Sequence, residues 1–175
     1  MSTKSPSGVF RIARQGDAVY VRVVGLATMT NSVTFKEFAD RMGEQGFRRF
    51  IVDLGECRGV DSTFMGLLLG LAHPAREKGK PPAPPDALTV VNAGAHCRKQ
   101  MESIGLHRLL KIPVEPSELP RGLELHELPE AETSPTARLK LIMKAHQDLV
   151  AIDKKNEEKF GAFLRDIQKN LGDKA

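Results

Sequence analysis

The chain has 175 residues, of which 41% are hydrophobic and 27% are charged, a balance that is typical of a globular protein and argues against wholesale disorder. Its formal net charge is +4, and most of that charge lies in residues 134–175, where nine lysines and arginines outnumber six acidic residues. The remaining body is nearly neutral, only 5% of the residues are aromatic and tryptophan is absent. This composition argues against a nucleic-acid partner.

The sequence also gives no signal for a membrane, a metal or a disulfide. No hydrophobic run approaches the roughly 20 residues that cross a bilayer, and the first residues lack the apolar segment of a secretory signal. We therefore expect a cytoplasmic protein without membrane insertion. Cys57 and Cys97 form no CxxC pair and are expected to be free thiols, while the five histidines lack metal-ligand spacing. No metal and no cofactor is predicted.

Strand and helix patterns alternate from the start of the chain. Residues 9–25 predict two strands around a turn at 15–17, because valines alternate with other residues at positions 19, 21 and 23. Residues 30–46 predict a helix that ends at Gly46. The continuous apolar run in residues 48–55 suits a strand that is covered on both faces.

The pattern continues to residue 114. A helix is predicted from Thr63, with an apolar face at Phe64, Leu67, Leu68 and Leu71, and the prolines of residues 78–86 predict a loop. Residues 87–93 then predict a strand, residues 94–106 a helix, and residues 107–114 a short strand or edge element. This order predicts an α/β fold, a mixed β-sheet with helices packed on it, over residues 1–114.

The rest of the chain differs in character. Residues 115–133 are rich in proline and glutamate and are expected to be a linker. Ser134-Pro135 starts a helical C-terminal extension, residues 134–175, whose apolar stripe is interrupted at Asp153 and Asn156. The stripe predicts either packing of the extension on its own domain or a homodimer through the C-terminal helix. Self-association is the preferred alternative.

Asp61-Ser62-Thr63, at the end of the second predicted strand-to-helix connection, offers more polar groups than a helix cap requires. The surrounding stretch "DLGECRGVDSTFMGLLLGL" resembles the STAS domain of bacterial anti-sigma-factor antagonists, and so does "LTVVNAGAHCRKQMESIGLHRLLKI". The resemblance covers about residues 8–114. The chain departs from that family in its proline-rich loop, in its C-terminal extension, and in having Phe64-Met65-Gly66 where Gly-Leu-Gly is common.

The resemblance implies a phosphoprotein of a partner-switching system in signal transduction and transcription regulation. Ser62 would be phosphorylated by a serine protein kinase that is often also the anti-sigma factor, and a serine phosphatase would reverse the step. The partner-binding residues carried over in this way are Asp61, Ser62, Thr63, Met65 and Gly66. The alternative is a STAS scaffold or transporter-associated interaction subunit that is never phosphorylated.

Physical chemistry supports a switch at this position. A phosphate adds about −1.5 to −2 charges, which the N–H groups at a helix start stabilise but which a packed partner would have to desolvate beside Asp61. A penalty of roughly 3–4 kcal/mol would weaken binding some hundreds-fold. Because the sequence contains neither GxSxG nor a glycine-rich phosphate loop, a binding module is preferred to an enzyme.

Overall fold

The computed structural model describes residues 7–73 and 82–173. Its centre is a five-stranded mixed sheet in the order β4-β3-β2-β1-β5. The antiparallel hairpin of β1 (Val9–Gln15) and β2 (Ala18–Ala27) turns at residues 16–17, as the sequence predicts. β3 (Arg49–Val60) and β4 (Leu88–Val91) continue the sheet in parallel pairings, which confirms the predicted mixed α/β class.

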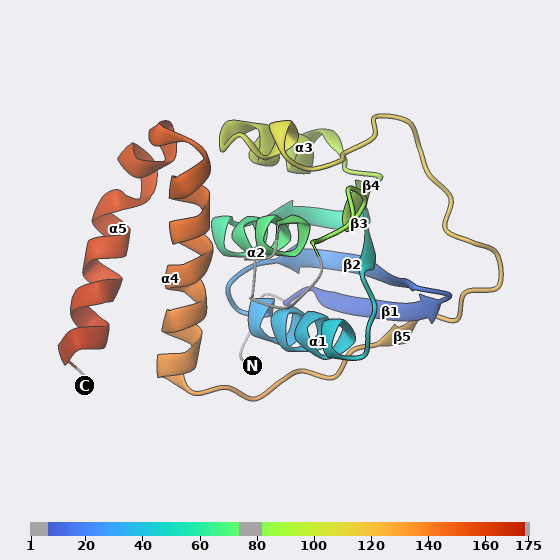
Figure 1. Cartoon of the computed structure of the whole chain (residues 1–175), viewed down its shortest axis with the longest axis horizontal. Helices are drawn as coiled ribbons and strands as arrows, with labels where there is room; N and C mark the ends of the chain where they lie inside the picture. The colour runs from blue at the N-terminus through green and yellow to red at the C-terminus, as the bar shows by residue number, and fades with distance from the viewer. Residues whose placement is uncertain (1–6, 74–81, 174–175) are drawn as a thin grey trace, which may run out of the picture.

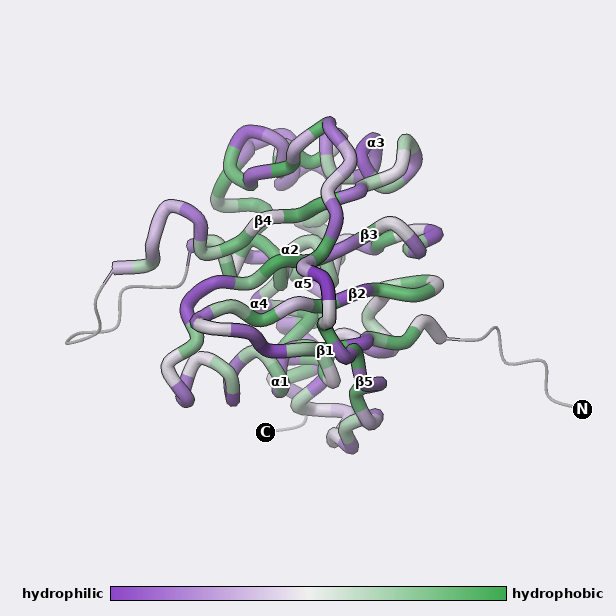
Figure 2. The backbone as a smooth tube through the Cα atoms, turned by 90° about the vertical axis from the view of Figure 1, so that its right-hand side faces the viewer, coloured by the Kyte–Doolittle hydropathy of each residue, from purple (hydrophilic) through white to green (hydrophobic). Residues whose placement is uncertain are grey.

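Three helices belong to the domain: α1 (Ser32–Glu44), α2 (Ser62–Ala72) and α3 (Ala95–Ser103). In Figures 1 and 2, α1 and α2 lie over the same face of the sheet. Residues 107–114 contain no strand of the sheet. Instead, a 3₁₀ turn η1 (Leu106–Arg108) is followed by one isolated bridge between Thr89 and Lys111. Residues 82–86 of the predicted proline-rich loop have no helix or strand, and residues 78–81 lie outside the described residues.

The core is formed where the helices meet the sheet. Its centre is a cluster of three phenylalanines, Phe10 from β1, Phe35 from α1 and Phe64 from α2, with ring centroids 5.2 to 6.0 Å apart. All three side chains are at most 2% exposed. Because β1, α1 and α2 each contribute one ring, this cluster fixes the position of α2 on the sheet.

Residues 115–133 are held to the domain near both ends of the segment. The segment runs from the β4 edge to the opposite edge, where β5 (His126–Glu127) pairs with β1 (Figures 1 and 2). Leu128 is buried, and its backbone N–H donates to the carbonyl of Phe10 at 2.8 Å. The backbone N–H of Ala131 donates to Thr34 Oγ1 at 3.0 Å. The expected linker therefore adds a strand to the sheet.

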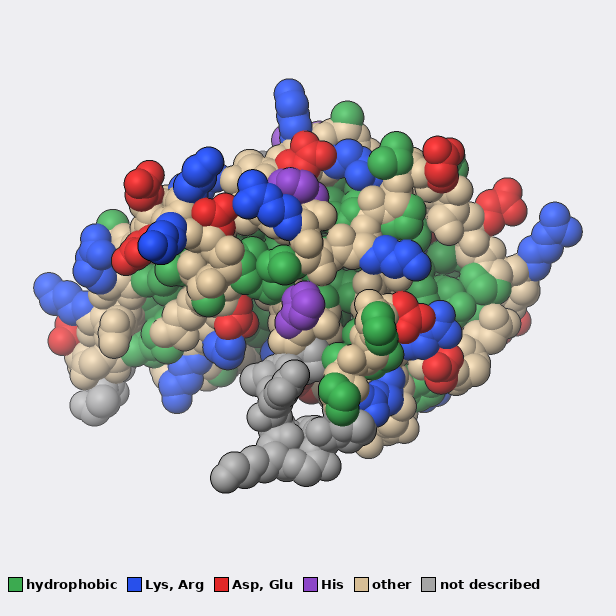
Figure 3. Space-filling view, turned by 45° about the horizontal axis from the view of Figure 1, so that its top comes forward, with side chains coloured by type: hydrophobic (Ala, Val, Ile, Leu, Met, Phe, Trp, Pro, Cys, Tyr) green, Lys and Arg blue, Asp and Glu red, His purple; other side chains and the backbone are tan. Residues whose placement is uncertain are grey.

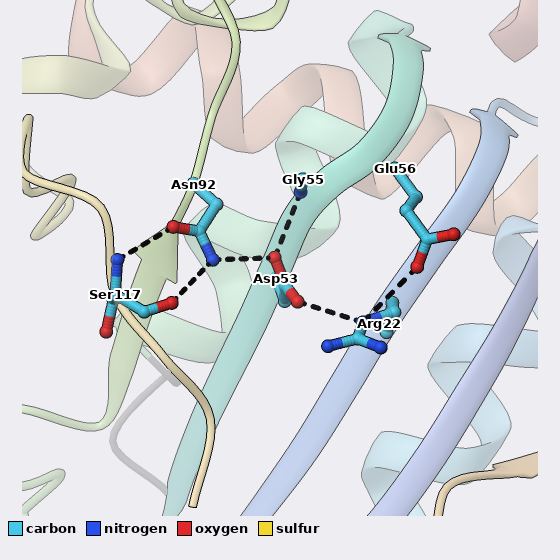
Figure 4. A network of polar contacts seen from close by, with 6 residues as sticks. All are labelled: Arg22, Asp53, Gly55, Glu56, Asn92 and Ser117. Atoms are coloured by element: carbon cyan, nitrogen blue, oxygen red, sulfur yellow. Dashed lines mark hydrogen bonds and ion pairs between the residues drawn. The ribbon is translucent and has the colours of Figure 1, made fainter.

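A polar network holds the start of this segment (Figure 4). Asn92 exchanges two hydrogen bonds with the backbone of Ser117, at 2.8 and 2.9 Å, and also donates to Asp53 Oδ1 at 3.0 Å. Asp53 is only 4% exposed, and its other oxygen accepts from Arg22 Nε at 3.0 Å. A buried carboxylate of this kind is tolerated because it is paired and hydrogen-bonded.

The C-terminal extension forms a helical hairpin, α4 (Pro135–Ile152) and α5 (Lys154–Asp173), which we call the arm. The arm stands at the end of the sheet where β2 and β3 finish, and α4 packs against α2 (Figure 1). The structure therefore shows the first of the two predicted arrangements, packing of the extension on its own domain. Within residues 7–73 and 82–173, no helix is long and apolar enough to cross a membrane.

The two polar residues that interrupt the apolar stripe make the turn of the arm. Asp153 caps α5 by accepting from the backbone N–H of Lys155 at 2.9 Å. Asn156 is fully buried, and its side-chain amide donates to the carbonyls of Leu149 and Ile104 at 2.8 and 3.0 Å. Since Ile104 belongs to the domain, Asn156 fixes the arm to the domain at a second point.

Replacing Phe64 by alanine removes one ring of the central cluster. We expect the free energy of unfolding to fall by about 3–5 kcal/mol, because the neighbouring rings cannot close the cavity. Urea unfolding followed by circular dichroism measures the change. Met29→Ala is the control, since that side chain is 49% exposed and its loss should change stability by less than about 0.5 kcal/mol. Equal losses for the two variants would contradict the assigned core.

Candidate functional site

The connection from β3 to α2 is built around Asp61, the N-cap residue of α2. One carboxylate oxygen accepts from the backbone N–H of Phe64 at 2.9 Å, which is the expected capping bond. The other accepts from the backbone N–H of Met29 at 2.7 Å and so holds the loop between β2 and α1. Both oxygens of Asp61 are therefore engaged in positioning the start of α2.

The Ser62 hydroxyl has a different partner, His146 on α4. Its Oγ lies 2.7 Å from His146 Nε2. The other ring nitrogen, Nδ1, lies 2.7 Å from the carbonyl oxygen of Ile142. Because a carbonyl can only accept, Nδ1 carries the proton in the neutral ring, and Nε2 accepts the hydrogen bond that Ser62 donates.

His146 is enclosed by the arm and α2. Its side chain is 2% exposed, and the rings of Phe160 and Phe163 on α5 meet it edge-on at centroid distances of 5.0 and 4.9 Å. Burial lowers the pKa of His146, while the bond to the Ile142 carbonyl and the charge of Asp61 oppose that change. The ring is therefore neutral at physiological pH, as its role as acceptor from Ser62 requires.

One turn along α2, the backbones of α2 and α4 come into close contact. A Cβ atom at Gly66 would lie 2.4 Å from the carbonyl oxygen of Ala145 and 2.7 Å from its Cβ. Only glycine fits there without a movement of α4. At Gly70, one turn further, the nearest atom to a built Cβ is Asp148 Oδ2 at 3.9 Å, which is ordinary contact.

The five predicted partner-binding residues are close together but largely covered. Asp61 and Ser62 are half-buried, whereas Thr63, Met65 and Gly66 are buried. The sequence pattern missed the residues that cover them, Ala145 and His146 of α4. His146 lies in the apolar stripe of the extension, and a polar residue in such a stripe is the signal that could have identified it.

The surroundings of this site give no indication of a metal. Among residues 7–73 and 82–173, no group of three or more histidine, cysteine or acidic side chains is placed to hold one. The two cysteines, Cys57 and Cys97, are both reduced.

Comparison with known proteins identifies the domain. A family model described as "Mlab, STAS domain" matches residues 10–111, more than half of the chain. The crystal structure of a Thermotoga maritima protein described as a "putative anti-sigma factor antagonist" is similar to this chain with a TM-score of 0.48 and 14% sequence identity. That similarity covers 59% of this chain and 84% of the other. No curated protein matches the chain by sequence.

Alanine substitutions at Gly66 and Gly70 form a matched pair. Each should strengthen α2 by about 0.5–1 kcal/mol through helix propensity. At Gly66, however, the methyl group collides with Ala145, so we expect α4 to detach or shift while the sheet remains folded. Hydrogen–deuterium exchange of residues 135–173 should rise strongly in Gly66→Ala and stay unchanged in Gly70→Ala. Equal exchange in the two variants would contradict close packing of the arm.

The burial of His146 also predicts a pH dependence. In the detached arm, His146 has an ordinary histidine pKa near 6.5. In the docked arm, burial lowers the pKa of His146, so the ring binds a proton only at lower pH. Docking should therefore be strongest above about pH 6.5 and weaken as pH falls below it, by at most about 1.4 kcal/mol per pH unit. Exchange of residues 135–173 measured from pH 7.5 to 5, corrected for the intrinsic pH dependence of amide exchange, tests this. His146→Gln should lose the effect, and a variant that keeps it would refute the assignment.

Proposed function

Because the chain belongs to the STAS domain family, a family that is generally non-enzymatic, we propose that it is a switchable protein-binding module whose binding surface is the N-terminal half of α2. The observation that carries the proposal is the position of α4. In the structure, the helix α4 of the arm already occupies this surface. Ser62, Gly66 and Gly70 follow one another at intervals of four residues, so small side chains lie along the contact and let another backbone approach.

The partner proposed for this surface is an anti-sigma factor that is also a serine protein kinase, with a serine phosphatase reversing its action. The surface itself suits a protein helix, since α2 offers apolar side chains and glycine, with the half-buried Ser62 hydroxyl at one end. Figure 3 shows acidic and basic side chains intermixed on the face that it draws, without a gathering of one sign. Residues 62–72 of α2 contain no charged side chain, so packing, and not a strong charge, supports recognition of the partner.

Ser62 is the proposed phosphorylation site. A phosphate on Ser62 would remove the proton that its Oγ donates to His146 Nε2, 2.7 Å away, and would place a charged group in the part-buried contact with α4. Phosphorylation therefore requires the arm to move away from α2. Once added, the phosphate is stabilised by the N–H groups at the start of α2, whereas a returning helix would have to desolvate it.

Two states of the domain follow. In the closed state the arm covers α2, and both the partner surface and Ser62 are occupied. In the open state an unmodified α2 binds the partner, and a phosphorylated α2 rejects it. The phosphate thus excludes the partner and the arm by the same desolvation penalty.

A second function is favoured by the same hydrogen bond. The Ser62 hydroxyl already has a hydrogen-bond partner in His146, and it is partly buried beneath α4. This arrangement suits a STAS scaffold or transporter-associated interaction subunit that is never phosphorylated. In that case the arm would be a permanent part of the domain, and a partner would bind elsewhere. The two functions differ in whether Ser62 acquires phosphate in the cell.

The first test is made in the cells that naturally contain the protein. The tagged full-length chain is purified, its intact mass is measured, and any phosphate is mapped by peptide mass spectrometry. We expect one phosphate on Ser62 and none in Ser62→Ala, because only that hydroxyl begins α2 beyond the cap. Phosphate confined to Thr63, or an unmodified protein throughout growth and stress, would favour the scaffold.

Residue 62 is then tested with the arm displaced. Ala145→Leu on α4 should displace the arm and leave α2 unaltered, because Ala145 is buried against Gly66. In this background, Ser62→Ala should retain the co-purifying partner, while Ser62→Asp should reduce its recovery about tenfold, since aspartate adds one charge beside Asp61. Quantitative mass spectrometry compares recoveries, with the chain that keeps Ala145 as the closed control. Equal recovery with alanine and aspartate would contradict a charge switch at this position.

A further inference from the structure

The two cysteines of the chain come together in the fold, although they are 40 residues apart in sequence. Cys57 lies near the end of β3 and is half-buried, and Cys97 lies in the first turn of α3 and is 1% exposed. The Cys97 Sγ atom is 3.8 Å from the carbonyl oxygen of Cys57, and the Cys57 Sγ atom is 3.3 Å from the carbonyl oxygen of Gly59. These residues play no part in the proposed partner switch.

The surrounding structure holds the two cysteine residues close to each other. The backbone N–H of Val60, three residues after Cys57, donates to Gln100 Oε1 at 3.0 Å, and Gln100 lies three residues after Cys97 on the same helix. This bond ties the end of β3 to the first turns of α3. Two cysteines on a strand and a helix that are tied together in this way can form a disulfide with only a small movement of their side chains.

The two thiols differ in their readiness to react. The hydrogen bond from Cys97 lowers the pKa of Cys57 to about 7, although burial opposes the change. The same interaction, together with burial, raises the pKa of Cys97. At neutral pH, Cys57 is therefore thiolate in a substantial fraction of molecules, while Cys97 keeps its proton.

We propose that Cys57 and Cys97 form a reversible disulfide site that is oxidised by a peroxide. The Cys57 thiolate attacks one peroxide oxygen, the O–O bond breaks, and the departing hydroxide takes up a proton to leave as water. Cys57 is then a sulfenic acid. The Cys97 sulfur attacks the Cys57 sulfur, the S–O bond breaks, and the hydroxide that leaves takes the Cys97 proton. Two thiols and one peroxide thus give one disulfide and two waters.

The cross-link would join β3 to α3 close to the proposed switch. Cys57 precedes Asp61 by four residues, so the disulfide would restrain the strand that leads to the start of α2. A thiol reductant restores the two thiols by exchange, which makes the site reversible.

The experiment treats the reduced full-length protein with hydrogen peroxide and follows its intact mass. The wild type should lose two hydrogen atoms without gaining oxygen, remain a single chain on a non-reducing gel, and regain its mass with dithiothreitol. Cys97→Ser should instead trap the sulfenic acid on Cys57, which dimedone labels. Cys57→Ser should leave Cys97 unmodified under the same conditions.

A second measurement is independent of oxidation. The alkylation rate of Cys57 with iodoacetamide, followed against pH, should have its midpoint near 7 in the wild type and nearer the ordinary value of 9.0 in Cys97→Ala. At pH 7 the variant should react roughly tenfold more slowly, since its thiolate fraction is smaller. Circular dichroism verifies that each variant is folded.

Three outcomes would overturn the proposal. They are disulfides formed between chains, oxygen added to Cys57 in the wild type without a disulfide, and an alkylation midpoint that does not move in Cys97→Ala. None of them bears on phosphorylation of Ser62, so the disulfide site and the partner switch stand or fall separately.

Discussion

The burial of α2 on both sides is the constraint on which the rest of the structure depends. Its residues from Thr63 to Leu69 are all buried, and a helix that is apolar around its whole circumference exposes apolar surface to water whenever one of its sides is uncovered. The sheet and the phenylalanine cluster cover one side, and α4 covers the other. The arm therefore buries the apolar side of α2 that the sheet leaves uncovered.

The polar groups of this contact explain why it can also be undone. Ser62 and His146 form one hydrogen bond across it, while Asn156 anchors the arm through the carbonyl of Ile104. An all-apolar interface would release only by exposing its whole surface to water. Here a charge at Ser62 would act at the edge of the contact, where it would replace the hydroxyl that donates to His146.

The sequence predicts those features that depend on local patterns. Alternating valines indicated β2, the i, i+3, i+4 spacing indicated the inner face of α2, and a glutamine-glycine-aspartate turn separated the first two strands. β5 was missed because two residues paired at a sheet edge leave no periodic signal. The proximity of Cys57 and Cys97 was missed for a related reason, since it depends on how α3 packs against β3 and not on spacing along the chain.

The position of the arm shows most clearly where sequence reasoning ends. An apolar stripe indicates that a helix is buried, but the same stripe suits the chain's own domain or a second copy. In the sequence, Asp153 and Asn156 interrupt the apolar stripe without an evident reason. In the fold, both lie at the turn between α4 and α5, where each has hydrogen-bond partners. The choice between the two arrangements depends on Gly66, where a missing side chain lets α4 approach, and this information lies 79 residues from Ala145.

The free energy with which the arm docks on α2 also determines how tightly a partner must bind in order to displace it. The apparent affinity of a partner is its intrinsic affinity multiplied by the fraction of molecules in the open state. If docking of the arm is favourable by about 3 kcal/mol, that fraction is below about 1%, and the apparent affinity falls by roughly two orders of magnitude. An arm covalently joined to its own surface is always present at high effective concentration. A partner helix therefore succeeds only if it makes contacts with α2, or with the domain around it, that α4 does not make.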